Sequence, residues 1–271
     1  MILCTAVRHE MSTHIDVDII ILSFAKNEEL RKVTETALAS LACSEPDSKI
    51  IFHVIVIESN HATAPYAGNH VKTIYLDEAF NYHRFMNHGI SITQSPYIAI
   101  CNNDLFFHPG WVSALLQAFH DDPKLLSASP ICGLHHPVHG YALDSGVHIG
   151  YAVRGEIAGW CLFFKRRMLD ITGPLDEKFF FWYADNDYAK TLETHGIRHG
   201  LVTTSRVDHL ESQTLETASS TQKTLLTQKA KYIYQRKWEG KSRLYVWRKM
   251  IQMYLKLHTK SLSKRLKSII K

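Results

Sequence analysis

The sequence predicts an α/β fold with a mostly parallel sheet flanked by helices. Two continuous apolar runs rich in β-branched residues, Val17–Leu22 and Ile50–Ile57, are typical of strands that are covered on both faces. Helical stretches alternate with such runs, which is the pattern of a parallel sheet between two layers of helices. The 271 residues, 45% hydrophobic and 21% charged, are enough for one large domain and an extension.

The elements are expected in alternating order along the chain. Apolar runs bounded by polar or turn residues predict strands at Val17–Leu22, Ile50–Ile57, Val71–Leu76, Tyr97–Cys101, Leu125–Ser129, Gly159–Phe164 and Leu201–Thr204. Stretches that follow polar turns and end near Gly or Pro predict helices at Glu29–Ala42, Phe80–Thr93, Trp111–His120, Lys165–Ile171 and Ala184–His195. The glycine- and histidine-rich segment Cys132–Gly150 is expected to be a loop.

Polar clusters follow three of the predicted strands directly. They are Ser23-Phe24, Glu58-Ser59-Asn60 and Asn102-Asn103-Asp104. Sheets of this class bind ligands in the crevice beyond the carboxyl ends of their strands, so these clusters are expected on one rim. The glycine motifs GxGxxG and GxxxxGK[ST] are absent from the sequence. A diphosphate bound at this rim would therefore need a divalent metal held by oxygen ligands.

The stretch Glu156–Leu192 combines an apolar wall with two acids. Five consecutive aromatic residues, Phe179–Tyr183, come shortly before Asp185 and Asp187. An apolar surrounding raises the pKa of a carboxyl, which suits a general base that works near neutral pH. The alternative interpretation is a core aromatic cluster followed by an acid that caps a helix.

The chain carries, in this order, the segments IIILSFAKNEEL, VIVIESN, NHGISITQSPYIAICNNDLFFHPGW, GWCLFFKRRMLDITGPLDEKFFFWYADNDYAKTLETHG and DHLES. Their order and spacing resemble the family 2 glycosyltransferases of the GT-A fold, and most of all the rhamnosyltransferase-like and galactofuranosyltransferase-like branch. The resemblance covers roughly residues 16–212. It implies a GT-A domain over residues 16–215 and inverting transfer of a sugar from a nucleoside diphosphate. Residues 216–271 are expected to form a basic helical extension.

The resemblance also implies roles for single residues at the metal and at the base. Asn102 and Asp104 match the ends of the family's metal-binding DXD motif, with Asn in place of the first acid. His209 matches the histidine that helps to hold Mn²⁺ or Mg²⁺ or the diphosphate. Asp185 matches the general base, and Ala184 replaces the acid that precedes the base in the family.

Other residues are expected around the donor and the acceptor. The donor-binding residues that the resemblance and the rim position suggest are Ser23, Phe24, Glu58, Asn60, Asn87 and Asn103. The residues expected in the acceptor and sugar pocket are Asp187, Gly159, Trp160 and Trp182. The candidate site residues also have ordinary structural alternatives. Asp185 could cap a helix, His209 could be a surface histidine, and either tryptophan could be a core aromatic.

The last fifty residues are strongly basic. Residues 221–271 contain fifteen Lys or Arg and one acid, a net charge of +14, whereas the rest of the chain has −9. Apolar positions at helical spacing in Ser242–His258, and again Leu262, Leu266, Ile269 and Ile270, predict a basic amphipathic segment that lies on an anionic membrane surface. Packing of this segment on the catalytic domain is the alternative. No nucleic-acid recognition motif occurs in the sequence.

The expected location is the cytoplasm, at the inner face of the membrane. The five cysteines form no CxxC pair, and no signal peptide or membrane-spanning run is expected. The predicted function is metal-dependent, inverting transfer from a nucleotide sugar to a glycan or lipid-linked glycan acceptor in cell-surface polysaccharide synthesis. The alternative functions are a catalytically silent module of the same fold that binds a sugar nucleotide or a glycan, and a nucleotidyltransferase.

Overall fold

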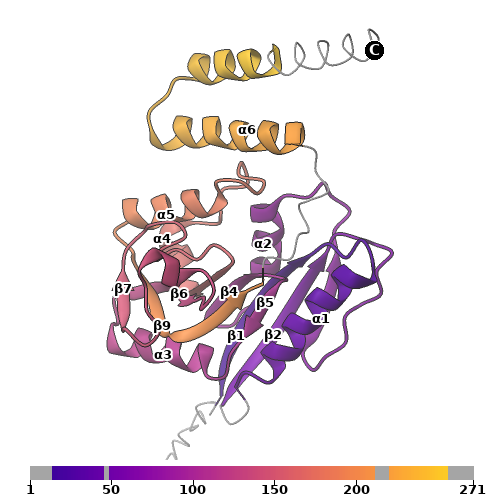
Figure 1. The fold of residues 1–271 in the computed structure, drawn as a ribbon, viewed down its shortest axis with the longest axis vertical. Helices are drawn as coiled ribbons and strands as arrows, with labels where there is room; N and C mark the ends of the chain where they lie inside the picture. The colour runs from indigo at the N-terminus through magenta and orange to yellow at the C-terminus, as the bar shows by residue number, and fades with distance from the viewer. Residues whose placement is uncertain (1–13, 46–48, 211–219, 256–271) are drawn as a thin grey trace, which may run out of the picture.

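The computed structural model describes residues 14–45, 49–210 and 220–255 (Figure 1). These residues form one nine-stranded sheet with the order β3-β2-β1-β4-β8-β6-β9-β5, and β7 pairs with β9 outside this path. The strands are β1 Ile15–Ser23, β2 Ile50–Glu58, β3 Val71–Tyr75, β4 Tyr97–Asn102, β5 Leu105–Phe107, β6 Leu125–Ile131, β7 Val147–Ile149, β8 Cys161–Lys165 and β9 Arg198–His209. The helices are α1 Glu28–Ala42, α2 Tyr82–Ser91, α3 Trp111–Asp121, α4 Leu169–Thr172, α5 Ala184–Thr194 and α6 Ser220–Trp238, with short 3-10 turns at His136–His139 and Arg166–Met168.

The sheet is parallel in its N-terminal half and mixed in its C-terminal half. Strands β3, β2, β1 and β4 pair in parallel. Strand β8 then lies antiparallel to both β4 and β6, and β5 and β7 lie antiparallel to β9. The prediction of a mostly parallel sheet therefore holds for the first half and for the β6–β9 pair, whereas β5, β7 and β8 pair only in antiparallel fashion. A buried strand has the same apolar pattern in both pairings, so the pattern could not distinguish them.

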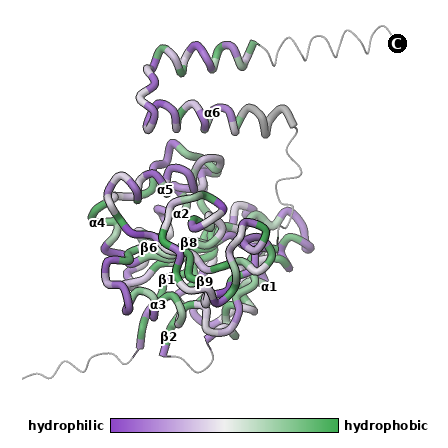
Figure 2. The backbone as a smooth tube through the Cα atoms, turned by 60° about the vertical axis from the view of Figure 1, so that its left-hand side comes forward, coloured by the Kyte–Doolittle hydropathy of each residue, from purple (hydrophilic) through white to green (hydrophobic). Residues whose placement is uncertain are grey.

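Helices cover both faces of the sheet, as predicted. Along β1, Ile19 and Ile21 pack with α1 and α3 in one core cluster, whereas Ile20 packs with α2 and α5 in the other. This alternation within one strand explains why the run reads as continuously apolar. Figure 2 shows the same distribution, with hydrophobic colours concentrated in the strands at the centre of the molecule.

Two helices begin at an asparagine that satisfies their free backbone N–H groups. The side chain of Asn27 accepts from Leu30 N (2.9 Å), which fixes the start of α1. The side chain of Asn81 accepts from Arg84 N (3.1 Å) at the start of α2. The predicted helix bounds lie within two residues of these starts.

Three segments differ from the sequence-based prediction. Strand β5 was not among the predicted strands, and β7 lies inside the expected loop 132–150. Both are three residues long and form through pairing with β9, which is far away in sequence and extends well beyond the predicted strand 201–204. The expected helix 165–171 splits into a 3-10 turn and the four-residue α4, which ends at Gly173.

The C-terminal helices lie across one end of the body. Figure 1 shows α6 beside α5, with the helix over 243–255 stacked on the far side of α6. Within the described part of the chain, no helix is long and apolar enough to cross a membrane. The predicted domain boundary at 215/216 and the apolar positions Leu262, Leu266, Ile269 and Ile270 lie outside the described residues.

Candidate functional site

A cavity of about 1260 Å³ opens at the carboxyl ends of β1 and β4. Its wall brings together the end of β1, the segment that follows β4, the end of β9, the aromatic run 180–183, the start of α5 and one face of α6. The predicted site residues that line this cavity are Ser23, Phe24, Asn102, Asn103, Asp104, Gly159, Trp160, Trp182, Asp185 and His209. The predicted residues Glu58, Asn60, Asn87 and Asp187 do not line it.

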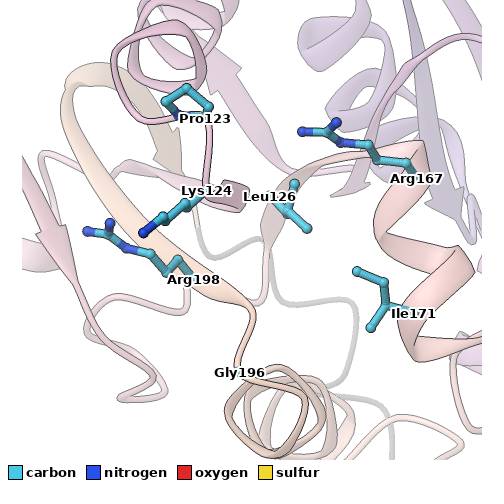
Figure 3. Close-up of a pocket in the computed structure, with 7 residues that line it drawn as sticks. All are labelled: Pro123, Lys124, Leu126, Arg167, Ile171, Gly196 and Arg198. Carbon is cyan, nitrogen blue, oxygen red and sulfur yellow. The ribbon is translucent and has the colours of Figure 1, made fainter.

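A second, smaller hollow of about 460 Å³ lies at the other ends of β6 and β9, where these strands begin (Figure 3). Lys124, Arg167 and Arg198 lie on its rim, and they come from three separate segments. Arg198 Nη1 is engaged by Asp122 Oδ2 at 2.9 Å. The residues that line this hollow include no acid that could act as a base, so the larger cavity is the candidate active site.

Asp104 and His209 meet at the base of the cavity. His209 Nε2 lies 3.2 Å from Asp104 Oδ1, and the amide nitrogen Nδ2 of Asn102 lies 3.5 Å from the same imidazole nitrogen. The pairing of β5 with β9 creates this contact, because Leu105 is the register partner of His209 and Leu210 N donates to Asp104 O (2.9 Å). The two side chains are thus brought together by the fold, although they are a hundred residues apart in sequence.

The Asp104–His209 pair fits a divalent metal whose other ligands come from a substrate. Mg²⁺ holds oxygen ligands at about 2.0–2.1 Å in an octahedron, so neighbouring ligand atoms lie about 3 Å apart, close to the observed separation. The described residues contain no cluster of three or more His, Cys, Asp or Glu that could hold a metal alone. Such a site would depend on phosphate oxygens and water, as is usual for nucleotide-bound metals.

Trp160 covers the imidazole of His209. The two rings are parallel, with centroids 5.2 Å apart and an interplanar angle of 1°. The backbone of Trp160 is fixed as well, since its carbonyl accepts from Asn102 N (2.8 Å). Trp160 therefore holds the imidazole plane against the loop that carries Asp104.

Asp185 lies in the first turn of α5, shortly after the aromatic run 180–183, and lines the cavity. Burial raises the pKa of its carboxyl, while the N–H of Asn186, which donates to Oδ1 at 2.9 Å, and the charge of Arg154 lower it in part. Gly159 makes room for this acid, because a Cβ at that position would lie 2.9 Å from the Cβ of Asp185. The neighbour Ala184 also lines the cavity and is 6% exposed.

The side-chain oxygens of Ser23, which lines the cavity, and of Glu58, which does not, are engaged in hydrogen bonds within the protein. Ser23 Oγ lies 3.0 Å from both Thr34 Oγ1 and Tyr66 OH. Glu58 is fully buried, and its carboxylate accepts from Tyr66 OH, Ala25 N and Asn60 N. These bonds fix the loop after β1, which presents the exposed ring of Phe24 to the cavity.

Three predicted asparagines serve to fix segments around the cavity. Asn60 donates to Ala25 O (2.6 Å), and Asn103, which lines the cavity, donates to Thr34 Oγ1 (2.9 Å). Asn87 exchanges two hydrogen bonds with the backbone of Leu175 (2.9 and 3.0 Å), which ties α2 to the segment that leads into the aromatic run.

Asp187 is held by α6 and not by the cavity. It is 2% exposed, and its carboxylate accepts from Lys237 Nζ (2.8 Å) and Trp238 Nε1 (2.7 Å). Lys237 also lies 2.9 Å from Asp176 Oδ2. Direct contact between Asp187 and an acceptor, as predicted, would require these partners to move away.

The wall formed by α6 was not predicted from the sequence. Leu226, Lys229, Ala230 and Ile233 line the cavity, and the Lys229 ammonium lies 5.1 Å from the ring centroid of Phe180. The apolar positions of α6 are scattered among its polar ones and form no clear periodic pattern that would predict this face.

Comparison with known proteins agrees with this arrangement. Residues 18–134 match the family model described as "Glycosyl transferase family 2". The solved structure described as "Crystal structure of GalNAc-T7 with UDP, GalNAc and Mn2+" matches with a TM-score of 0.54 and 9% identity over 94% of this chain. The protein has the GT-A fold. The match covers 58% of that other chain, and no curated protein matches the sequence.

The GT-A fold class predicted from the sequence is thus confirmed. The narrower prediction, the rhamnosyltransferase-like and galactofuranosyltransferase-like branch, stays a prediction, as do the domain bounds.

Proposed function

We propose that this protein is a metal-dependent, inverting glycosyltransferase that moves a sugar from a nucleoside diphosphate to a glycan or lipid-linked glycan. The observation that carries the proposal is that one cavity is lined by the Asp104–His209 pair and, separately, by the buried acid Asp185. Leaving-group stabilisation and proton removal need two such groups at two places. The neighbour's title names UDP, GalNAc and Mn2+, which supports a nucleotide-sugar donor.

The donor end would be formed by Asp104, His209 and Asn102. A bound Mn²⁺ or Mg²⁺ would neutralise the diphosphate as it leaves. Asp104 contributes the charged oxygen ligand, His209 a nitrogen ligand, and Trp160 keeps the imidazole in plane. Phe24 lies at the rim of the cavity, where its exposed ring offers a stacking surface for the base.

Asp185 would accept the proton of the acceptor hydroxyl as that oxygen attacks the anomeric carbon. A single displacement needs one base and no covalent nucleophile, so the anomeric configuration inverts. The buried setting raises the pKa of Asp185, which makes its carboxylate a better proton acceptor than an exposed one.

The aromatic run and α6 would bind the acceptor. Phe180, Trp182 and Ile233 supply apolar surface for a sugar ring or a lipid chain. The helix over 243–255 exposes the large apolar side chains Leu244, Trp247, Ile251, Tyr254 and Leu255 beside basic residues. This combination supports peripheral binding at an anionic membrane, which we place at its cytoplasmic face, and a role in cell-surface polysaccharide synthesis.

A silent binding module of the same fold is the second candidate. Two substitutions support it, Asn102 for the first acid of the metal motif and Ala184 for the acid before the base. Donor and metal could bind in such a module without transfer.

Thermal unfolding with a panel of nucleotide sugars and Mn²⁺ tests the proposal. A donor at a hundred times its dissociation constant stabilises the native state by about 2.7 kcal/mol. Metal-dependent hydrolysis of that donor, lost in Asp185→Asn, supports the enzyme. Donor-dependent stabilisation without hydrolysis or transfer to any acceptor supports the module, and no stabilisation by any donor overturns both candidates.

A further inference from the structure

Arg154 lies in a tight turn between β7 and β8 and lines the same cavity as Asp185. Backbone bonds from Arg154 N to Ile157 O (2.9 Å) and from Ile157 N to Ala152 O (3.0 Å) hold this turn. Arg154 has a φ of +67°, in the left-handed region that residues with long side chains rarely adopt. Such backbone conformations cost about 1–3 kcal/mol and cluster at binding and catalytic sites.

The guanidinium of Arg154 makes no hydrogen bond or ion pair with any residue that the structure describes. Other cations of the cavity are engaged: Lys229 lies over the ring of Phe180, and Lys178 lies 3.8 Å from Asp176 Oδ1. A guanidinium offers five N–H donors in a planar fork that matches a carboxylate or a phosphate. Arg154 therefore presents its donors to whatever fills the cavity.

Arg154 and Asp185 line the same cavity. The positive charge of Arg154 lowers the pKa of the Asp185 carboxyl, in opposition to burial, which raises it. Asp185 lies against Gly159, because a Cβ at that position would lie 2.9 Å from the Cβ of Asp185. Trp160, the next residue, stacks on His209 of the metal pair.

We propose that Arg154 binds an oxyanion carried by the acceptor, beside the hydroxyl that Asp185 deprotonates. This inference rests on the proposed function, since it takes Asp185 as the base. A two-pronged contact from Arg154 to the oxyanion fixes the rotation of the acceptor, so that one hydroxyl faces the carboxylate. The oxyanion is a sugar carboxylate or a phosphate, and both present the oxygen pair that the fork matches.

Binding of matched probes to the full chain tests this assignment. The probes are methyl glucoside, methyl glucuronide and methyl glucoside 6-phosphate, each titrated by calorimetry in the presence of UDP and Mn²⁺. Arg154→Asn removes the guanidinium and keeps a residue that tolerates a positive φ, so the turn should persist. Arg154→Gly serves as a second variant of the same kind. Arg167→Asn is the matched control, because Arg167 is exposed in the separate hollow of Figure 3.

We expect the parent and Arg167→Asn to bind one anionic probe at least about tenfold more tightly than the neutral glucoside, and both Arg154 variants to lose that preference. The preferred probe identifies the acceptor anion as a carboxylate or a phosphate. Equal binding of all three probes by the parent overturns the inference, and so does an unchanged preference in the Arg154 variants.

The same titrations separate this inference from the proposed function. Failure of the parent to bind UDP with Mn²⁺ counts against the proposed function itself. UDP binding without any anion preference counts against the role of Arg154 alone. Weaker UDP binding in Arg154→Asn, with probe preference unchanged, moves Arg154 to the donor end and likewise overturns the inference.

Discussion

His209 Nε2 lies 3.2 Å from Asp104 Oδ1, and the pairing of β5 with β9 fixes this separation. The two side chains are a hundred residues apart in sequence, so their contact forms together with the end of the sheet. Substitution of either residue should therefore change metal-dependent binding without changing the rest of the cavity.

Asp104→Ala should abolish the Mn²⁺-dependent part of UDP affinity, and His209→Ala should weaken it by a smaller factor. The physical reason is that Asp104 supplies the only charged ligand of the pair, whereas His209 supplies a neutral one. Calorimetric titration of UDP with and without Mn²⁺ measures both effects.

Asp208→Ala is an unsuitable control for this titration, because Asp208 fixes Arg206 and His108. Asp144→Asn, at an exposed loop position outside the cavity, is suitable, because Asn tolerates the positive φ of +55° at this position. Unchanged Mn²⁺ dependence in Asp104→Ala would remove the metal assignment.

Asp185→Asn should lower turnover by roughly 10²–10⁴-fold, the range typical of general-base removal. UDP affinity should change by less than about threefold, because the role proposed for Asp185 is to accept the proton of the acceptor and not to bind the diphosphate. The amide oxygen can still accept from Asn186 N, so the helix start is kept. Burial makes the ionised carboxylate costly in the folded state, so the variant should unfold at the same or a higher temperature at neutral pH. A near-parental transfer rate in this variant would show that the base is another group.

The rate of transfer should fall as pH drops through the raised pKa of Asp185, because the base works only when ionised. Arg154→Asn removes a charge that lowers this pKa, so the acid limb of the pH profile should move to higher pH. The measurement is kcat/KM across pH at saturating donor, with Arg167→Asn as control. A profile that stays in place when Arg154 is replaced would show that its charge does not act on the base.

Local sequence patterns predicted the central strands and the position of the cavity rim. Apolar runs located β1, β2 and β4, and polar clusters at their carboxyl ends marked the rim of the cavity. The roles of Asp104, His209 and Asp185 came from a resemblance, and the structure places all three on the wall of one cavity. Local patterns could not predict β5, since three residues form a strand only through a partner a hundred positions later.

The packing of α6 over the cavity could not be predicted from the sequence, for a different reason. The polar contacts of α6 with the body include those of Lys237 and Trp238, two residues whose sequence resembles an ordinary helix end. From the sequence, Asp187 could equally well be an acid that contacts the acceptor. Only the fold shows that its carboxylate oxygens are bonded to Lys237 and Trp238. No sequence pattern marked Arg154 as a binding residue, because a single arginine in a loop matches no motif.

Lys237→Met should loosen α6 from the body. The substitution leaves the buried carboxylate of Asp187 with one partner, Trp238, and removes the contact with Asp176. Removal of one partner from a buried pair costs about 3–5 kcal/mol, and we expect about 1–3 here because Lys237 is partly exposed. Hydrogen exchange should rise in α6 and not in β1. Lys231→Met, on the same helix and without a described contact to these acids, is the matched control.

The same contact makes the docking of α6 sensitive to acid. Burial raises the pKa of Asp176, but hydrogen bonds from Lys237 Nζ and from the Lys178 N–H, together with the charges of both lysines, outweigh it, so the folded-state pKa lies below the usual value. The contribution to stability is therefore present above the unfolded pKa and is lost as pH falls through the lowered folded value. Protection of α6 in hydrogen exchange that stays constant through this acid range would contradict the assignment.

The basic helix over 243–255 should bind anionic membranes through its exposed apolar side chains. Truncation after Gly240 keeps α6 and its contacts with Asp187, so it removes this surface without opening the cavity. We expect the truncated chain to lose binding to vesicles that contain phosphatidylserine, and binding of the full chain to fall as salt rises.

Trp247→Ser should weaken vesicle binding, since this ring is 62% exposed and packs little in the fold. Thr227→Ser on α6 is a conservative control. Equal vesicle binding by full-length and truncated protein, with both chains folded, would exclude residues 241–271 as the anchor.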